Sequence, residues 1–468
     1  MEYWRNNIFL SSPGILFSSK NRIIDTEFMN IQLFLTGWLI CIIALCFIKL
    51  KWAVALFLAY IMLVPYINLG IPGLGTGDNV IRLIMLMCSL KELLKKHRRL
   101  NFKPLVPFIV YFLVSLLMIP FQSGEPTSTM LTNWRKDLMN ILLLPLVIWN
   151  VVIIDKSSLK LFKNTMLICI IVSVGYGLFL TQLEGVNPYV MYFSQFREDL
   201  YVFESYYQAS GQGRLFGRIS SVYFHPMAFA LFLGFSIIYL FYVRKSLKWY
   251  VFIIILFLTI LMSLLCGVRS VLGGLFVAFI YYLFTQKSFK LLILSCVCGL
   301  VFLVFISFLP ELSTYLGSMI HISNDGGEFR GSSVEMRVGQ LIGAIEEASK
   351  NPLFGLGYKW TDYYVNLKGD HPICLAFESL AFVVICNSGI IGVLLWVYMI
   401  LWYFRINKNM NLWNLSVINS MMVFYISYSI ITGEYGYMKT FLIFYILMLG
   451  EARWHFILNN HSGLYNHV

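Results

Sequence analysis

The sequence predicts an all-α polytopic integral membrane protein with about 12–13 transmembrane helices and a large extracytoplasmic loop subdomain. Of the 468 residues, 59% are hydrophobic and only 12% are charged, which is more apolar sequence than a water-soluble core needs. Runs of about 17–25 mostly apolar residues, the length that crosses a bilayer core, recur from one end of the chain to the other.

The expected spanning helices follow an N-terminal segment, residues 1–30, which has no signal-peptide pattern and is expected to lie at the membrane surface. The helices are 31–48, 52–69, 80–94, 104–121, 138–154, 164–183, 219–243, 249–266, 271–285, 291–309, 373–404, 412–432 and 440–457. The count becomes twelve if the short third segment fails. Residues 31–309 therefore hold ten helices and an external loop, 184–218. Residues 310–372 form the large external loop, and 373–468 hold the last helices and a cytoplasmic tail.

Positive charge sets the expected orientation of these helices. Lysine and arginine gather in alternate loops, such as 95–103, 156–163 and 244–248, which should face the cytoplasm. This distribution accounts for the net charge of +12 without a nucleic-acid partner. All nine cysteines lie in or beside apolar segments, so we expect neither disulfides nor a metal site.

The large external loop contains an expected amphipathic helix. Ser332 and Glu335 have capping-box spacing, and Pro352 with the glycine turn LFGLG ends the segment. The apolar residues that fall on one helical stripe are Val334, Val338, Leu341, Ile342 and Ile345. We expect a helix of about four turns that lies on the membrane surface or caps a cavity.

Glu378 stands inside the apolar stretch 373–392, where a charge is costly unless it faces a polar cavity or a partner. If Asp370 or His371 caps this helix and Pro372 opens it, Glu378 lies roughly 10 Å into the helix. His371 would then lie two turns earlier on the same face. Both side chains could look into one external cavity, although Glu378 could instead pair with a basic residue and His371 could be only interfacial.

Four arginines fall on the external side, where the positive-inside tendency gives no reason for them. They are Arg214, Arg218, Arg269 and Arg337. Guanidinium is a planar fork suited to phosphate oxygens, although a single arginine could also reach lipid headgroups. An acid beside such a group suggests a reaction in which arginines hold a lipid diphosphate as it leaves and the carboxylate takes the proton of an attacking hydroxyl. That chemistry needs no divalent metal and no cofactor.

Four patches between residues 217 and 392 carry a recognisable order of arginines, prolines and glycines. GRISSVYFHPMAFALFL, 217–233, resembles the Arg-x-x-Gly/Ser-x-Phe-Asn-Pro-Asn patch of the bacterial O-antigen ligase and O-antigen polymerase superfamily, with His225 in place of the usual Asn. LLCGVRSVLGGLF, 264–276, resembles its small-Ser/Thr-Arg turn, and EMRVGQLIGAIEEASKNPLFGLGY resembles its Arg and Asn-Pro-Leu-x-Gly-x-Gly pattern. The fourth patch ends in Gly389 and Gly392. Counting back from these glycines places Glu378 where the ligases carry a His that is regarded as the base, which favours the polymerase branch.

The resemblance implies a GT-C-like, lipid-dependent glycosyltransferase in the bacterial inner membrane, with its active site facing the periplasm. Undecaprenyl-diphosphate-linked glycan would be both donor and acceptor, and membrane lipids and a chain-length regulator are the other conceivable partners. Glu378 would be the general base and His371 an accessory base or acceptor binder. The diphosphate clamp would be Arg218, Arg269 and Arg337, joined by Arg214. The weaker candidates for substrate binding are His225, Tyr358, Trp360 and Tyr363, and the aromatic residues among them could instead be interfacial anchors.

Three rival functions stay open at this stage. A ligase would move finished glycan onto lipid A core or protein. A flippase or other transporter would carry charges through both membrane halves, whereas here the charges that stand out are external. A membrane scaffold would leave the external arginines without a role.

Overall fold

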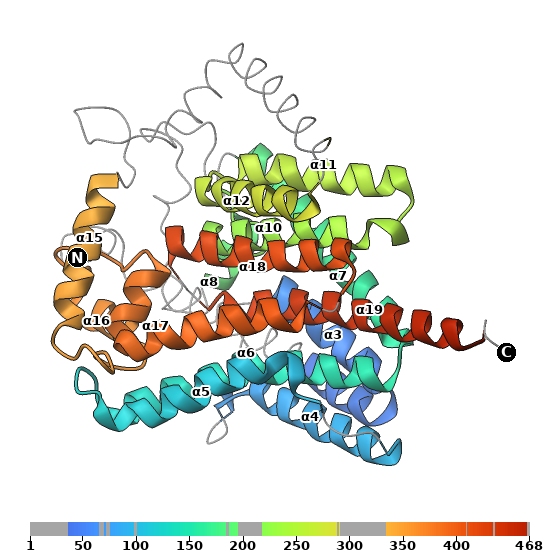
Figure 1. Ribbon diagram of the computed structural model, residues 1–468, viewed down its shortest axis with the longest axis horizontal. Coiled ribbons are helices and arrows are strands. Elements are labelled where there is room, and N and C mark those ends of the chain that lie inside the picture. Colours follow the sequence, from blue (N-terminus) through green and yellow to red (C-terminus); the bar gives the residue numbers. More distant parts are fainter. Residues whose placement is uncertain are drawn as a thin grey trace, which may run out of the picture.

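The computed structural model describes residues 36–64, 70–71, 75–97, 101–183, 187–194, 218–287, 290, 334–408, 410–433 and 436–465. Within these ranges the chain is a bundle of helices (Figure 1). The helices are Thr36–Ile48, α3 (Leu50–Leu63), α4 (Gly77–Lys95), α5 (Val106–Met118), α6 (Thr127–Ile154), α7 (Ser157–Leu180), α8 (Pro188–Ser194), α10 (Pro226–Val243), α11 (Trp249–Leu265), α12 (Arg269–Gln286), α15 (Val334–Ala348), α16 (Trp360–Lys368), α17 (Leu380–Ile406), α18 (Leu412–Thr432) and α19 (Met438–Tyr465). A two-residue antiparallel pair, β1 (Gly70–Ile71) and β2 (Gly75–Thr76), precedes α4.

The helices confirm an all-α polytopic membrane fold. Seven helical spans among the described residues are long and apolar enough to cross a membrane, and three shorter helices are also apolar. The expected helix 291–309, the N-terminal segment 1–30 and residues 310–333 lie outside the described residues. Helix α6 begins at Thr127, well before the expected 138, because polar residues of its first turns continue the helix beyond the apolar stretch.

The expected helix 373–404 is wrong at its start. Pro372 does not open a helix, since α17 begins at Leu380 with Ser379 before it in extended conformation. Glu378 therefore lies just outside the helix, and His371 is not two turns away on a shared helical face. An apolar composition alone did not distinguish a buried irregular segment from the first turns of a spanning helix.

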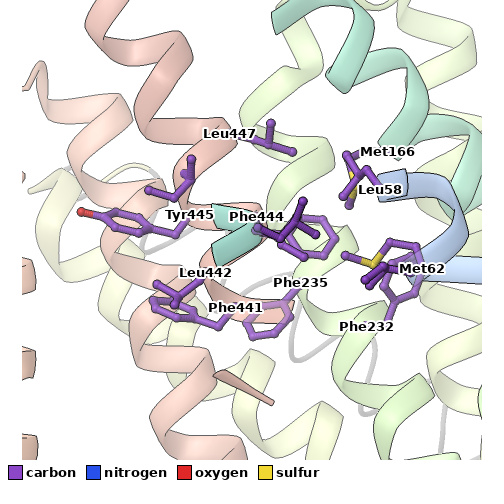
Figure 2. Close-up of a cluster of buried hydrophobic side chains, with 14 of the residues drawn as sticks. Leu58, Met62, Met166, Phe232, Phe235, Phe441, Leu442, Phe444, Tyr445 and Leu447 are labelled. Carbon is purple, nitrogen blue, oxygen red and sulfur yellow. The ribbon is translucent and has the colours of Figure 1, made fainter. Parts of the chain in front are cut away.

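Aromatic and aliphatic side chains of α3, α7, α10 and α19 form the centre of the bundle (Figure 2). Phe232 and Phe235 of α10 pack against Phe444 and Phe441 of α19, with ring centroids 5.7–6.1 Å apart in the closest pairings. Every residue from Phe441 to Leu447 is buried, so the first half of α19 is covered on all sides. A helix that is apolar all round belongs inside a bundle, and α19 runs through the middle of Figure 1.

Helices α15 and α16 lie together at one end of the bundle, on the left of Figure 1, beside the start of α17. We call this the α15 end. The expected amphipathic helix is present as α15, although Ser332 lies outside the described residues. Its stripe faces away from the bundle, because Val338, Ile342 and Ile345 are each about half exposed.

Candidate functional site

A glycine turn, residues 351–357, fills a break in α17. Gly389 has φ 55° and ψ −152°, so the helix is interrupted there and the following amides need acceptors from elsewhere. Ile390 N–H donates to the Pro352 carbonyl at 2.9 Å, and Ile391 N–H donates to that of Leu353 at 3.2 Å. The Leu356 N–H in turn donates to the Cys386 carbonyl at 2.8 Å. The turn and the broken helix therefore complete one another's backbone hydrogen bonds.

Glycine is needed on both sides of this contact. A Cβ added to Gly355 would lie 2.4 Å from the Ser388 nitrogen, and one added to Gly389 would lie 2.5 Å from the Pro352 oxygen. Both glycines also have positive φ, which side chains disfavour. The two glycine patterns of the sequence thus meet in one joint, which fixes the start of α17 against the segment that follows α15.

The segment before α17 is a tight loop held by its own backbone. His371 and Leu375 exchange two backbone hydrogen bonds, at 3.0 and 2.9 Å. Leu375 and Phe377 have φ of 51° and 52°, a strained conformation for residues with bulky side chains. Strain of this kind persists only where the surroundings determine the conformation, and it clusters at functional sites. The loop ends with Glu378 at the N-terminus of α17.

Glu378 forms an ion pair with Arg337 of α15. Arg337 Nη2 donates to Glu378 Oε2 at 3.0 Å, and Nη1 donates to the Glu378 backbone carbonyl at 2.7 Å. Nη1 also lies 3.2 Å from Gln340 Oε1. The side chains of Arg337 and Glu378 remain 25% and 34% exposed. Among the described residues Oε1 of Glu378 accepts no hydrogen bond, so Arg337 orients the carboxylate through its other oxygen.

His371 is more enclosed than Glu378. Its Nδ1 accepts hydrogen bonds from the backbone N–H groups of Ile373 and Cys374, at 3.2 and 3.0 Å. Its Nε2 lies 3.6 Å from Glu347 Oε1, and its ring packs against Tyr364 and Phe377. These contacts tie the His371 side chain to the backbone of the loop, and the roles of His371 and Glu378 in proton transfer stay predictions.

The four aromatic residues after the glycine turn have different surroundings. Trp360 is buried against Tyr364 and Phe377, so its ring belongs to a small local core. Tyr358 is buried too, and its hydroxyl donates to Asp137 Oδ2 at 3.1 Å. Tyr363 is half-buried on α16. Trp360 therefore does not offer a face for sugar stacking, and the roles of Tyr358 and Tyr363 stay predictions.

Arg218 and Arg269 come from neighbouring segments near the starts of α10 and α12. The Ile219 N–H donates to the Cys266 carbonyl at 3.4 Å, and Arg269 is the first residue of α12. His225 caps α10, since its Nδ1 accepts from the Met227 N–H at 3.2 Å. Burial, together with the charge of Arg218, lowers the pKa of His225 to about 4. Arg214 lies outside the described residues, and the convergence of all four arginines on one ligand stays a prediction.

A second group of charged residues, which we did not expect from the sequence, lies deeper in the bundle. Arg82 of α4 is 2% exposed, and its Nη1 donates to the side-chain oxygens of Asn79 and Asn140, at 2.6 and 2.5 Å. Asp78, 6% exposed, pairs with Arg82 across 4.0 Å. Asp137 of α6 pairs with Lys359 at 3.0 Å. The sequence did contain a signal for this group. Asp78 and Arg82 are four residues apart at the edge of an apolar segment, and charges inside a membrane rarely lack a role.

One more buried carboxyl lies beside Gly357 of the glycine turn. Glu125, in the loop before α6, is 5% exposed and accepts a hydrogen bond from Asn133 Nδ2 at 3.4 Å. Burial raises the pKa of this carboxyl to about 7, and the negative charge of Asp362 adds to the shift. In the part of the chain that the structure describes, no cluster of three or more His, Cys, Asp or Glu side chains has the arrangement of a metal site.

Comparison with known families supplies an independent result. Residues 254–397 match the O-antigen ligase family, and the matched stretch includes Arg269, Arg337, His371 and Glu378. It covers less than half of the chain and begins after Arg218 and His225. A search of curated proteins finds no match. Residues 254–397 therefore carry the likeness of this multi-pass helical membrane protein to the O-antigen ligase and polymerase superfamily of glycan-transferring proteins.

Proposed function

We propose that this chain polymerises lipid-linked oligosaccharide repeat units at the outer face of the cytoplasmic membrane. The repeat units would be carried on undecaprenyl diphosphate and would become O-antigen, capsule or exopolysaccharide. The observation that carries the proposal is the Arg337–Glu378 ion pair, which lies inside the O-antigen ligase domain at the strained start of α17.

The reaction follows from the two side chains of this pair. A hydroxyl of one repeat unit attacks the anomeric carbon of a second, forming a new C–O bond. The bond from that carbon to the diphosphate oxygen breaks, and its electron pair leaves with the undecaprenyl diphosphate. Glu378 Oε1 accepts the proton of the attacking hydroxyl. Arg337, whose planar fork matches phosphate oxygens, stabilises the negative charge on the leaving diphosphate.

The partial exposure of Arg337 and Glu378 suits the binding of a diphosphate followed by proton transfer. Arg337 is available to an arriving diphosphate without leaving a deeply buried carboxylate unpaired, because Glu378 is itself one-third exposed. We infer that Arg269 and Arg218 hold the same diphosphate from the mouth of α12 and α10. Glutamate at the position where the ligases carry histidine favours polymerisation over ligation.

The test uses purified protein and purified lipid-linked repeat unit as the only glycan substrate. A polymerase lengthens these units, which gel electrophoresis or mass spectrometry resolves as a ladder. A ligase makes no ladder and transfers glycan only when lipid A core or an acceptor protein is added. Absence of transfer in both reactions, with a folded protein, would contradict the proposed function.

A further inference from the structure

The buried charges of α4 line a cavity of about 230 Å³. Its walls come from the end of α3, the start of α4, the middle turns of α6 and the start of α19. The lining residues that matter for the argument are Tyr60, Asp78, Arg82, Asp137, Asn140 and Lys439. A water molecule occupies roughly 30 Å³ of liquid, so the cavity has room for several waters or for one sugar ring.

The lining charges are balanced. Asp78 and Asp137 bring two negative charges, and Arg82 and Lys439 bring two positive charges. On the adjoining cavity Lys359, which pairs with Asp137, is itself offset by Asp362 at 3.9 Å. A phosphate would be attracted by the two cations but repelled by the two carboxylates. A metal cation would be attracted by the carboxylates but repelled by the cations. The balance therefore favours an uncharged polar ligand over either ion.

One atom of Asp78 and one atom of Arg82 lack hydrogen-bond partners, although both side chains are hydrogen-bonded through other atoms. Asp78 Oδ1 and Arg82 Nε are both inaccessible and have no partner among the described residues. A buried polar atom without a partner costs roughly 1–3 kcal/mol, and more when it is charged, so such atoms normally have a ligand or water. One is an acceptor and the other a donor. A hydroxyl group can satisfy either, and a sugar presents several hydroxyl groups at once.

A second cavity adjoins the first on the side of the segment that holds Glu378. A smaller cavity of about 70 Å³ shares Asp137 and Ile141 with the first. Tyr358 and Leu380 also line it. Leu380 is the first residue of α17, two positions after Glu378. The shared walls thus run from the charges of α4 to the start of α17.

We propose that the cavity lined by Asp78, Arg82 and Lys439 binds an uncharged sugar residue of the acceptor glycan. This proposal deepens the proposed function and rests on it, because only a polymerase would make the bound sugar part of an acceptor glycan. The carboxylate of Asp78 accepts from sugar hydroxyls, while the Lys439 ammonium and the Asn140 amide donate to them.

Binding to purified protein in detergent tests this proposal with two soluble probes. One probe is the free oligosaccharide repeat unit, released by mild acid from the host's lipid-linked pool, and the other is inorganic pyrophosphate. Asp78→Asn removes the acceptor charge with little change of shape. Val64→Trp fills the cavity, because Val64 lines it, and leaves every charge in place. Asp155→Asn is the matched control, since Asp155 pairs with Lys51 in the loop that follows α6.

We expect the oligosaccharide to bind the wild type and the Asp155→Asn protein alike. Asp78→Asn and Val64→Trp should each weaken its binding by at least about tenfold, with pyrophosphate binding unchanged. Unchanged oligosaccharide affinity in both cavity variants, or no binding by the wild type at millimolar probe, would overturn the proposal. Loss of pyrophosphate binding in the same variants would also overturn it, since the cavity would then be an anion site. If Asp78→Asn does not fold, Val64→Trp decides.

Elongation of lipid-linked repeat units separates this proposal from the proposed function. Normal elongation by folded Asp78→Asn and Val64→Trp proteins would sink the acceptor site alone. Conversely, no elongation by the wild type, with oligosaccharide binding that both cavity variants lose, would remove the polymerase activity and keep the glycan site.

Discussion

Two ion pairs of this molecule, Arg337–Glu378 and Asp78–Arg82, differ in how they are built. Arg337 and Glu378 join segments 41 residues apart at the α15 end, and their side chains are 25% and 34% exposed. Asp78 and Arg82 lie one turn apart on α4, and their side chains are 9% and 2% exposed. An exposed pair opens at small cost, whereas a buried pair cannot lose one partner without leaving an uncompensated charge. The exposed pair can therefore exchange its partner for a ligand, whereas the buried pair must also support the fold.

The largest expected effect is on activity at the exposed pair. Glu378→Gln keeps the size of the side chain but removes the proton acceptor, so elongation should fall by about 10²–10⁴-fold. The thermal stability should change little, because the Arg337–Glu378 pair is partly solvated. The measurement is elongation rate per amount of folded protein in detergent. Glu346→Gln, an exposed carboxylate on α15, is the control and should keep wild-type activity.

Retained elongation by Glu378→Gln would remove the base assignment and break the first half of the comparison. His371→Ala would then decide whether histidine takes the proton. Its interpretation requires the melting curve, since the His371 side chain also holds the loop before α17.

The buried pair should show the next largest effect, this time on stability. Arg82→Met leaves the Asp78 carboxylate buried without its cation, so the free energy of unfolding should fall by about 3–5 kcal/mol. Arg337→Met should cost about 1 kcal/mol or less. Adding Asp78→Asn to Arg82→Met should recover part of the loss, because the unpaired charge is then gone. Equal losses for Arg82→Met and Arg337→Met would erase the distinction between the two pairs.

The fold class and the exposed pair were within reach of the sequence for the same reason. Long apolar runs have one stable solution in lipid, the helix, so the spanning segments could be identified from composition alone. Glu378 and Arg337 stood out because each is a charge at an unusual place in that pattern. From the sequence, a basic partner for Glu378 was one of the alternatives, and the structure identifies this partner as Arg337 of α15.

Other features depended on tertiary contacts that the sequence does not display. The start of α17 at Leu380 follows from the backbone bridge between His371 and Leu375, two residues of an otherwise apolar stretch. The break at Gly389 is stable only because residues 352–353 supply carbonyl acceptors from across the joint. Arg82 passed unnoticed because it lies at a helix edge, where an arginine usually reaches water. Only the packing of α3, α6 and α19 around it shows that it is buried.

The joint between the glycine turn and α17 gives a third way to sharpen the comparison, with an intermediate effect. Gly355 and Gly369 both have positive φ, at 74° and 81°, so alanine at either carries a similar backbone cost. Alanine at Gly355 would also collide with the Ser388 nitrogen, whereas no atom lies within 4 Å of a Cβ at Gly369. We expect Gly355→Ala to be less stable than Gly369→Ala by about 1–3 kcal/mol, measured as unfolding in detergent.

Elongation should follow the same order, because the turn also places Tyr358 and Lys359 on Asp137. Equal stability of Gly355→Ala and Gly369→Ala would mean that the joint can relax, and the two ion pairs would then not be held in register by it.

The smallest effect concerns Glu125, whose carboxyl has a pKa raised from 4.5 to about 7. Between these pH values the folded protein holds a proton on Glu125 that the unfolded chain has released. The stability contributed by Glu125 is therefore present at low pH, declines as pH rises from about 4.5 to 7, and is lost above that. His225 acts with the opposite sign, since its pKa is lowered to about 4 and its contribution is lost as pH falls from about 6.5 to 4.

Subtracting the stability of Glu125→Gln from that of wild type at each pH removes the His225 contribution, because His225 titrates alike in both proteins and only Glu125 differs. Wild type should lose stability relative to Glu125→Gln as pH rises from 5 to 8, by about 1–3 kcal/mol at most. Asp362→Asn should shift the decline to lower pH, since Asp362 is the negative charge that helps to raise the pKa of Glu125. A flat difference curve would show that Glu125 is ionised and solvated in the folded state, and that the enclosed environment of the Asp78–Arg82 pair does not extend to the α15 end.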